Sequence, residues 1–447
     1  MKKKVVSALL CATIVATMFA GCGSKESDNN ASTPDTSKAD TSSEVSEPAE
    51  DTGKVLNIYC WNEEFKSRIT AHYPDYQEVD ATHGKIGDVD VVWNITPNDD
   101  NAYQNNLDAT LLNQADAPAD DKIDLFLVEA DYALKYVDTD YTMPIKDLGI
   151  TDDDLSKQYQ YTKDIVTDSK GVLKGLSWQG CPGVLFYNRD AAKEVLGTDD
   201  PDKVQESVKD WDTYNDTAKK MKDAGYKMTA SANDTYRVYS NNVTSKWVDG
   251  NKINIDDNIM KWVDDSKAQV DAGETGTCDL WSDDWSKGFY PQGKVFCYFG
   301  PAWLVNFSMA ADTEGSIGYN GGWGAAQGPQ GFFWGGTWIC AAQGTDNANL
   351  VKDIMLKMTT DDDIMKDIVV DDDDFVNNST VMNGLADGSI KVKDDKEYTS
   401  KILGGQNPLP MYCAGVETLD LSNLSSYDQG CNEEFQNAMK NYFEGKA

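Results

Sequence analysis

The stretch VLNIYCWNEEF, Val55 to Phe65, decides how the chain folds. Its first six residues, Val55 to Cys60, are mostly apolar and predict a short buried strand. The segment from Glu63 to His72 predicts a helix that Pro74 stops. Trp61 lies between the two, directly after the strand. A strand, a short connection and a helix together form the first unit of an α/β fold.

The same alternation of strand and helix continues along the chain. We expect further strands at 89–93, 123–128, 184–187 and 294–299, and further helices at 98–112, 131–137, 189–196, 212–224 and 350–358, with another helix beginning at Pro201. Alternating strands and helices form βαβ units, so the sequence predicts mainly parallel sheets flanked by helices. Because 447 residues are too many for one ordinary core, we expect two lobes.

The N-terminus has the pattern of a bacterial secretion signal. Lys2, Lys3 and Lys4 precede an apolar run from Val5 to Ala20, and the run is short for a membrane span. The residues FAGC, which end at Cys22, resemble a lipobox, although Phe stands where Leu is usual. The resemblance implies that residues 1–21 are removed and that a lipid is attached to Cys22. The alternative is an ordinary signal peptide with an incidental cysteine.

The residues after Cys22 and the overall charge limit the location and the partners. Residues 22–53 are rich in Ser, Thr, Asp, Glu and Pro and have few apolar side chains, so they predict a disordered tether. No later stretch has about 20 consecutive apolar residues. The formal net charge of −35 disfavours nucleic acid as a partner.

The cysteines, histidines and acidic clusters predict no metal site and no cofactor. Seven cysteines remain beyond Cys11 and Cys22, and they are scattered without a CxxC pair; Cys413 and Cys431 could form a disulfide, but spacing alone does not decide it. Two histidines are too few for a His-based site. The acidic residues between Asp361 and Asp374 lack the glycine and final glutamate of an EF-hand, so we expect a solvated face there.

Many tryptophans stand directly after expected strands or among glycines. Trp61 follows the first strand, Trp303 follows Gly300 and Pro301, and Trp334 lies beside Gly335. Ligands of open α/β sheets bind beyond the carboxyl ends of the strands. An indole ring there can stack on the C–H face of a sugar, while nearby carboxylates and amides can bind its hydroxyls. Each of these tryptophans could instead belong to the core.

Six stretches carry a resemblance to a known family. They are VLNIYCWNEEF (55–65), DLFLVEADYALKY (124–136), GVLKGLSWQGCPGVLFYNRDAAKEVLG (171–197), WDTYNDTAKKMKDAGYK (211–227), GKVFCYFGPAW (293–303) and GGWGAAQGPQGFFWGGTWI (321–339). In this order, and together with the lipobox, they resemble the extracellular solute-binding proteins of carbohydrate ABC importers, the maltose-binding-protein-like group.

The resemblance implies a two-lobed periplasmic-binding-protein-like fold with the ligand between the lobes. Each lobe would hold a mainly parallel sheet, and a hinge of crossing segments would join the two. Residues 54–178 and 326–360 would form the N-terminal lobe, and residues 179–325 and 361–447 would form the C-terminal lobe. The ligand-binding residues that it implies are Trp61, Asn62, Glu63, Glu129, Asp131, Trp178, Trp303, Trp334, Gly335 and Trp338, with Trp281, Trp285, Tyr236 and Tyr239 as weaker candidates.

The implied function is capture of a carbohydrate, most simply an oligosaccharide, without chemistry on it. The partners would be the sugar, the permease of an ABC importer, and the membrane through the N-terminal lipid of a monomer on the outer face of the cytoplasmic membrane. One alternative is a secreted glycoside hydrolase, which would also use tryptophans and needs two carboxylates. Others are a binding protein for a polyamine or a peptide, and a structural surface protein.

Overall fold

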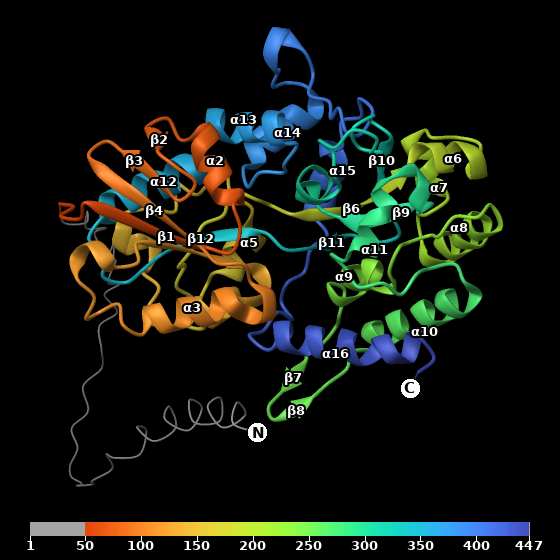
Figure 1. Ribbon diagram of the computed structural model, residues 1–447, viewed down its shortest axis with the longest axis horizontal. Helices are drawn as coiled ribbons and strands as arrows, with labels where there is room; N and C mark the ends of the chain where they lie inside the picture. Colours follow the sequence, from red (N-terminus) through yellow and green to blue (C-terminus); the bar gives the residue numbers. More distant parts are fainter. Residues whose placement is uncertain (1–49, 447) are drawn as a thin grey trace, which may run out of the picture. The chain divides into compact units, whose positions relative to one another are not determined.

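A six-stranded sheet organises the first lobe of the computed structural model, which describes residues 50–446 (Figure 1). Its strands, in spatial order, are β12 (Thr337–Ala341), β5 (Leu125–Glu129), β1 (Val55–Cys60), β4 (Val89–Ile95), β3 (His83–Ile86) and β2 (Tyr76–Glu78). β1 lies parallel to both β4 and β5, and the outer pairs are antiparallel. The predicted signal peptide, Cys22 and nearly all of the tether lie outside the described residues.

The second lobe is built on a smaller sheet around β6 (Pro182–Asn188). β6 pairs with β10 (Trp323–Ala326), β11 (Phe332–Phe333) and β9 (Cys297–Gly300), and every one of these pairs is antiparallel. The α/β class and the two-lobed arrangement are confirmed, but the expectation of a mainly parallel sheet is wrong for this lobe, and in the first lobe only the pairs of β1 with β4 and β5 are parallel. The reason is that β9, β10 and β11 come from distant parts of the chain and run against β6. A separate hairpin joins β7 (Val248–Asp249) and β8 (Lys252–Ile253).

Helices flank both sheets, and several begin and end where the sequence predicts. They are α2 (Glu64–His72), α3 (Ala102–Leu111), α4 (Ala133–Val137), α5 (Gln160–Ile165), α6 (Arg189–Leu196), α7 (Pro201–Glu206), α8 (Trp211–Asp223), α9 (Tyr236–Ser240), α10 (Asp257–Ala272), α11 (Asp283–Ser286), α12 (Ala348–Thr360), α13 (Asp362–Asp372), α14 (Ser379–Asp387), α15 (Leu409–Val416) and α16 (Asp428–Phe443). Asp200 caps α7 ahead of Pro201, and Gly197 ends α6 in the left-handed region.

Two extended segments cross between the sheets. In the first, Leu176 pairs with Ile339 of β12, and the chain enters β6 at Pro182. In the second, the chain leaves β11 at Phe333 and enters β12 at Thr337. The segment around Val376 runs beside the first crossing and pairs with Gln179. The lobe boundaries at 178, 325 and 360 stay a prediction. After residue 360, α13 packs against α2 of the first lobe, whereas α16 packs against α10 of the second lobe.

A largely buried cluster of charged groups joins α2 to the end of α13 and to the chain directly after it. Arg68 pairs with Asp372 at 2.8 Å and lies 3.8 Å from both Glu64 and Asp374, while His72 Nε2 lies 3.0 Å from Asp372. The expectation of a solvated acidic face is therefore wrong for Asp374, which is buried. Its charge is tolerated because a guanidinium and a side-chain amide lie beside it.

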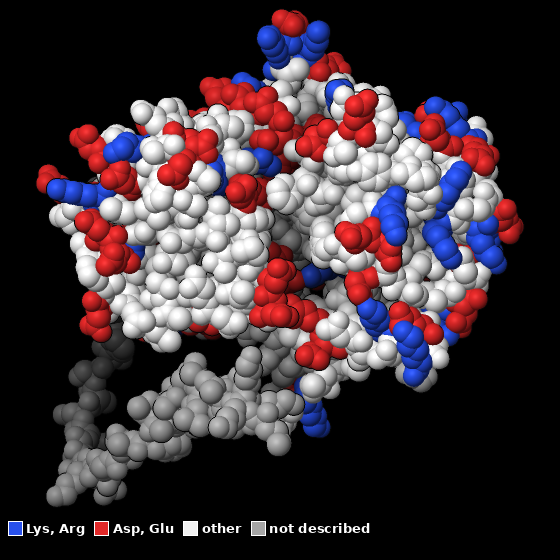
Figure 2. All heavy atoms as spheres, viewed as in Figure 1, with Lys and Arg blue, Asp and Glu red and all other residues white. Residues whose placement is uncertain are grey.

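The rest of the acidic charge lies largely at the surface (Figure 2). Figure 2 also shows acidic side chains gathered where the two lobes meet on the visible face. The seven cysteines of residues 50–446, Cys413 and Cys431 included, form no disulfide. In the same residues no group of three or more His, Cys, Asp or Glu side chains could hold a metal ion, and no helix is long and apolar enough to cross a membrane.

We expect Trp178→Ala to lower the free energy of unfolding by about 3–5 kcal/mol, the usual cost of removing a large aromatic side chain from a core. Trp178 is 0% exposed and stacks on Phe65 with ring centroids 5.3 Å apart. Urea denaturation followed by circular dichroism measures the change. Trp281→Ala, which removes an indole that is 54% exposed, is the matched control and should cost much less. Equal losses in the two variants would contradict the burial of Trp178.

Candidate functional site

A cavity of about 310 Å³ lies between the two lobes, beside the crossing segments. It is lined by Trp61, Asn62, Glu64, Glu129, Gln179, Trp281, Trp303, Phe307, Ser308, Trp334, Gly335, Gly336 and Thr337. Trp61 and Asn62 directly follow β1, and Glu129 ends β5, so the first lobe contributes the carboxyl ends of two parallel strands. This edge of an α/β sheet is where ligands bind. The second lobe contributes the segment after β9.

Aromatic rings form one side of the cavity. The rings of Trp281 and Trp303 are inclined by only 27°, with centroids 6.2 Å apart, and Trp334 lies 5.5 Å from Trp303 and 5.7 Å from Trp281. Trp303 is half-buried and donates its indole N–H to the carbonyl of Trp334 at 3.4 Å. Trp61, from the first lobe, is held by Tyr103 at 5.7 Å. Both lobes therefore present flat apolar surfaces to the same cavity.

Hydrogen-bonding groups form the floor of the cavity. The Gln179 amide donates to Glu64 at 2.8 Å and to Asp374 at 3.0 Å, and its carbonyl oxygen accepts from the backbone N–H of Thr337. Burial raises the pKa of Glu64 to about 7, although Arg68 opposes the rise. Burial also raises the pKa of Glu129 to about 8, and the charge of Asp131 adds to the rise. The floor can thus both donate to and accept from a ligand's hydroxyls.

Gly335 allows the indole of Trp303 to come close to the second crossing. Its φ of +67° lies in the left-handed region, and a Cβ there would lie 3.2 Å from Cζ2 of Trp303 and 3.5 Å from a carboxylate oxygen of Glu129. A larger residue would strain the backbone and push the ring away. The glycine therefore fixes the distance between the aromatic side and the carboxylate.

Six of the ten residues expected from the sequence line this cavity and four do not. The six are Trp61, Asn62, Glu129, Trp303, Trp334 and Gly335. Glu63 is exposed at the start of α2, and Asp131 turns away to pair with Arg237. Trp178 and Trp338 are core residues, and the Trp338 indole donates to the carbonyl of Thr162. Binding of a ligand by any of the ten stays a prediction.

Of the four weaker candidates for ligand binding, one lines the cavity and three do not. Trp281 reaches the cavity, whereas Trp285 is buried and donates to Asp234 at 2.7 Å. Tyr236 and Tyr239 are buried in the second lobe.

Four polar residues of the cavity were not expected from the sequence: Glu64, Gln179, Ser308 and Thr337. Glu64 was missed because consecutive helical residues point about 100° apart, and only the packing of α2 decides that Glu64 rather than Glu63 faces inward. No local sequence pattern points to Gln179, because its hydrogen-bond partners Glu64 and Asp374 are 115 and 195 residues away.

A comparison with protein families shows to which family the chain belongs. The family model described as "Bacterial extracellular solute-binding protein" matches residues 80–399. The chain belongs to this family. As a member of this family it is a binding protein and not an enzyme, which decides against the glycoside hydrolase considered from the sequence, and it acts outside the cytoplasm. A search of the curated proteins finds no match.

Solved structures of solute-binding proteins share the fold. A solved extracellular solute-binding protein of family 1 is 17% identical, with a TM-score of 0.67, over 88% of this chain and 95% of its own. The ABC transporter associated binding protein of B. animalis subsp. lactis Bl-04 is 19% identical, with a TM-score of 0.63, over 88% and 93%. The galacto-N-biose-/lacto-N-biose I-binding protein of Bifidobacterium longum is 12% identical, with a TM-score of 0.64, over 90% and 94%. The two-lobed fold of this solute-binding protein is thereby confirmed.

Glu64→Gln should remove a pH dependence of stability. Because the pKa of Glu64 is raised from 4.5 to about 7, the folded state keeps a proton that the unfolded state loses in this range. The free energy of unfolding of the wild type therefore falls as the pH rises from 4.5 to about 7, and we expect a shallower fall in the variant.

Chemical denaturation at pH 5 and pH 8 measures the difference. Glu63→Gln, a change at the exposed neighbouring residue, is the control and should follow the wild type. Parallel pH profiles for the wild type and Glu64→Gln would show that Glu64 is ionised in the folded protein.

Proposed function

We propose that this chain is the lipid-anchored substrate-binding component of a carbohydrate ABC import system. The observation that carries the proposal is the cavity between the lobes, in which indole rings face a floor of carboxylates and an amide. Sugar rings offer apolar C–H faces to aromatic planes and hydroxyl edges to such polar groups. Trp303 is the first candidate for stacking, and Glu64, Glu129 and Gln179 are the candidates for binding hydroxyls.

The solved relatives support a sugar ligand. The binding protein of B. animalis was solved in complex with beta-1,6-galactobiose, and that of Bifidobacterium longum with lacto-N-biose. The several indoles of the present cavity offer room for more than one sugar ring, which favours an oligosaccharide.

Lobe closure would couple binding to transport. The cavity takes Trp61 and Glu129 from the first lobe and Trp303 from the second, so a sugar makes all its contacts only when the lobes are closed. The sugar then shifts the population toward the closed form, which docks on the permease.

The last residues of the proposed tether are hydrogen-bonded to the first lobe. The carboxylate of Asp51 accepts from the backbone N–H groups of Asn349 and Leu350 at 2.8 and 2.9 Å, in the first turn of α12. The backbone N–H groups of Thr52 and Gly53 donate to the carbonyl of Asp346, both at 3.0 Å. A lipid on Cys22 would therefore be tethered to the α12 side of the first lobe.

Binding itself is tested by a thermal-shift screen against mono- and oligosaccharides, beta-1,6-galactobiose and maltose among them. We expect the melting temperature to rise with at least one sugar and no reducing ends to be released. A melting temperature unchanged by every sugar would contradict the proposal.

Trp303→Ala should weaken binding of the sugar found in this screen at least tenfold, because a stacking surface worth about 1.4 kcal/mol or more is lost. Isothermal titration calorimetry measures the affinity, and the circular dichroism spectrum should stay unchanged. Trp211→Ala is the matched control, since it removes another half-buried indole of the second lobe that does not line the cavity. An unchanged affinity in Trp303→Ala would remove this residue from the site.

Cys22→Ser should move the protein from the membrane fraction to the culture medium, since the serine cannot accept the lipid. Cell fractionation with immunoblotting measures the distribution. Cys11→Ser changes a cysteine inside the apolar run and should leave the protein in the membrane fraction. Membrane retention of both variants would indicate that another feature holds the protein there.

A further inference from the structure

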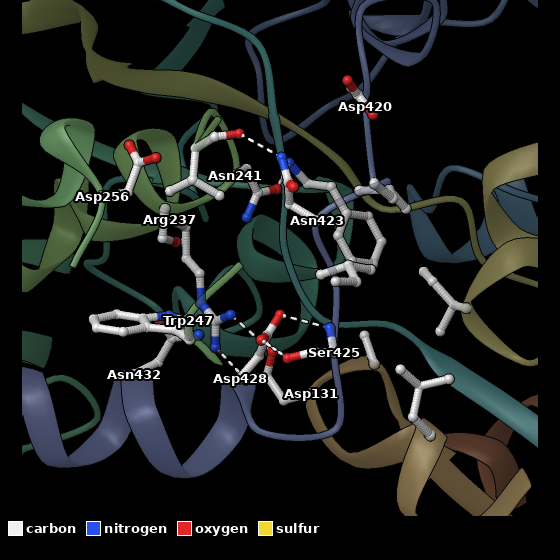
Figure 3. A pocket seen from close by; sticks show the side chains of 18 of the residues that line it. Asp131, Arg237, Asn241, Trp247, Asp256, Asp420, Asn423, Ser425, Asp428 and Asn432 are labelled. Atoms are coloured by element: carbon white, nitrogen blue, oxygen red, sulfur yellow. Dashed lines mark hydrogen bonds and ion pairs between the residues drawn. The ribbon is translucent and has the colours of Figure 1, made fainter. Parts of the chain in front are cut away.

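A second cavity, of about 240 Å³, lies between the lobes and shares no lining residue with the first. The first lobe contributes Asp131, Leu134 and Ile165, and the second lobe contributes Arg237 and Trp247. The remaining wall comes from the chain before and within α16, including Asn423, Ser425, Asp428 and Asn432 (Figure 3).

The second crossing separates the two cavities. Phe333 lines the second cavity and the next residue, Trp334, lines the first. Neighbouring side chains of an extended segment point to opposite sides, so the segment forms a shared wall. At the end of β5, Glu129 likewise lines the first cavity, and Ala130 and Asp131 line the second. This wall therefore separates a ligand in one cavity from a ligand in the other.

An ion pair between the lobes forms one end of the second cavity. Arg237 of α9 pairs through both terminal nitrogens with Asp131, and one of these contacts measures 2.8 Å. Figure 3 shows Asp428 beside this pair. Asp428 accepts from the hydroxyl of Ser425 at 2.6 Å and from its backbone N–H at 3.2 Å. Burial raises the pKa of Asp428, the charge of Asp131 adds to the rise, and Arg237 opposes it.

Acidic side chains outnumber basic ones in the lining. The five carboxylates are Asp131, Asp164, Asp256, Asp420 and Asp428, and the one basic side chain is Arg237. Arg237 is already committed to Asp131, and Asp256 is held by Thr244, Ser245 and Asn258. Asp428 therefore has no cation of its own in this lining. A partly buried carboxylate in this position is stabilised by a cation and repels an anion.

The rest of the lining suits an alkyl chain and a few hydrogen bonds. The apolar side chains include Leu134, Ile165, Val243, Ile259, Phe333, Leu421 and Leu424. Ser240 also lines the cavity, and its hydroxyl oxygen, which is buried, makes no hydrogen bond within residues 50–446. The side-chain amide of Asn423 donates to the carbonyl of Val243 at 2.9 Å and ties the segment before α16 to the second lobe.

We propose that the second cavity binds a small aliphatic amine, with its ammonium group on Asp428 and its carbon chain against the apolar wall. The volume of about 240 Å³ accommodates a short alkyl chain. The ammonium group supplies the positive charge that Asp428 lacks within this lining. This site is additional to the sugar cavity, and an amine there contacts residues of both lobes.

Isothermal titration calorimetry of the full chain with 1,4-diaminobutane tests the proposal. We expect saturable binding that weakens with added salt, and none with 1,4-butanediol, which has the same length and no charge. Asp428→Asn should weaken amine binding at least tenfold, since it keeps the shape and removes the charge. Leu421→Trp, which fills the cavity from its apolar wall, should weaken it as well. Asp190→Asn, in the first turn of α6 and outside the lining, is the matched control and should bind the amine as the wild type does.

Titrations of Trp303→Ala separate this site from the sugar cavity. This variant should keep the amine affinity of the wild type, whereas Asp428→Asn should keep its sugar affinity. Loss of amine binding in Trp303→Ala with retention in Asp428→Asn would place the amine in the sugar cavity and overturn the proposal. Absence of saturable binding of 1,4-diaminobutane to the wild type would overturn it as well, whatever the sugar titrations show.

Discussion

The side chain of Gln179 links more separate parts of the structure than any other group described above. Its amide nitrogen donates to Glu64 of α2 and to Asp374 after α13, and its carbonyl oxygen accepts from the backbone of Thr337 in the second crossing. All of these groups are buried, so losing one partner would leave a polar atom unsatisfied at a cost of about 1–3 kcal/mol. These bonds therefore tie the start of the first crossing, the end of the second and the floor of the first cavity together.

This fixed floor gives the aromatic residues different roles. Trp178 and Trp338 lie against the inner face of the first lobe and stabilise it by burial, whereas Trp281 and Trp303 lie above the floor and remain partly accessible. The chemistry of an indole is the same in both settings. What differs is whether another part of the chain covers the face of the ring. The cavity lies where the ring faces are left uncovered.

The two cavities between the lobes differ in electrostatics although one short segment divides them. In the first, burial raises the pKa values of Glu64 and Glu129, which brings both carboxyl groups toward the neutral form. In the second, carboxylates outnumber the single guanidinium, and Asp428 lacks a cation of its own. The alternation of Phe333 and Trp334 places their side chains in different cavities, while the charge of Asp131 in the second cavity still raises the pKa of Glu129 in the first.

The sequence by itself determined the local elements and the family. The apolar run from Val55 to Cys60 forms β1, Asp200 and Pro201 open α7, and Gly197 ends α6, because propensity and capping act over a few residues. Only the tertiary structure decided the strand directions around β6, the inward position of Glu64 rather than Glu63, and the pairing of Asp131 with Arg237. These depend on which distant segments meet: the partners of Gln179 and Arg237 are more than 100 residues away, and no local pattern encodes their contact.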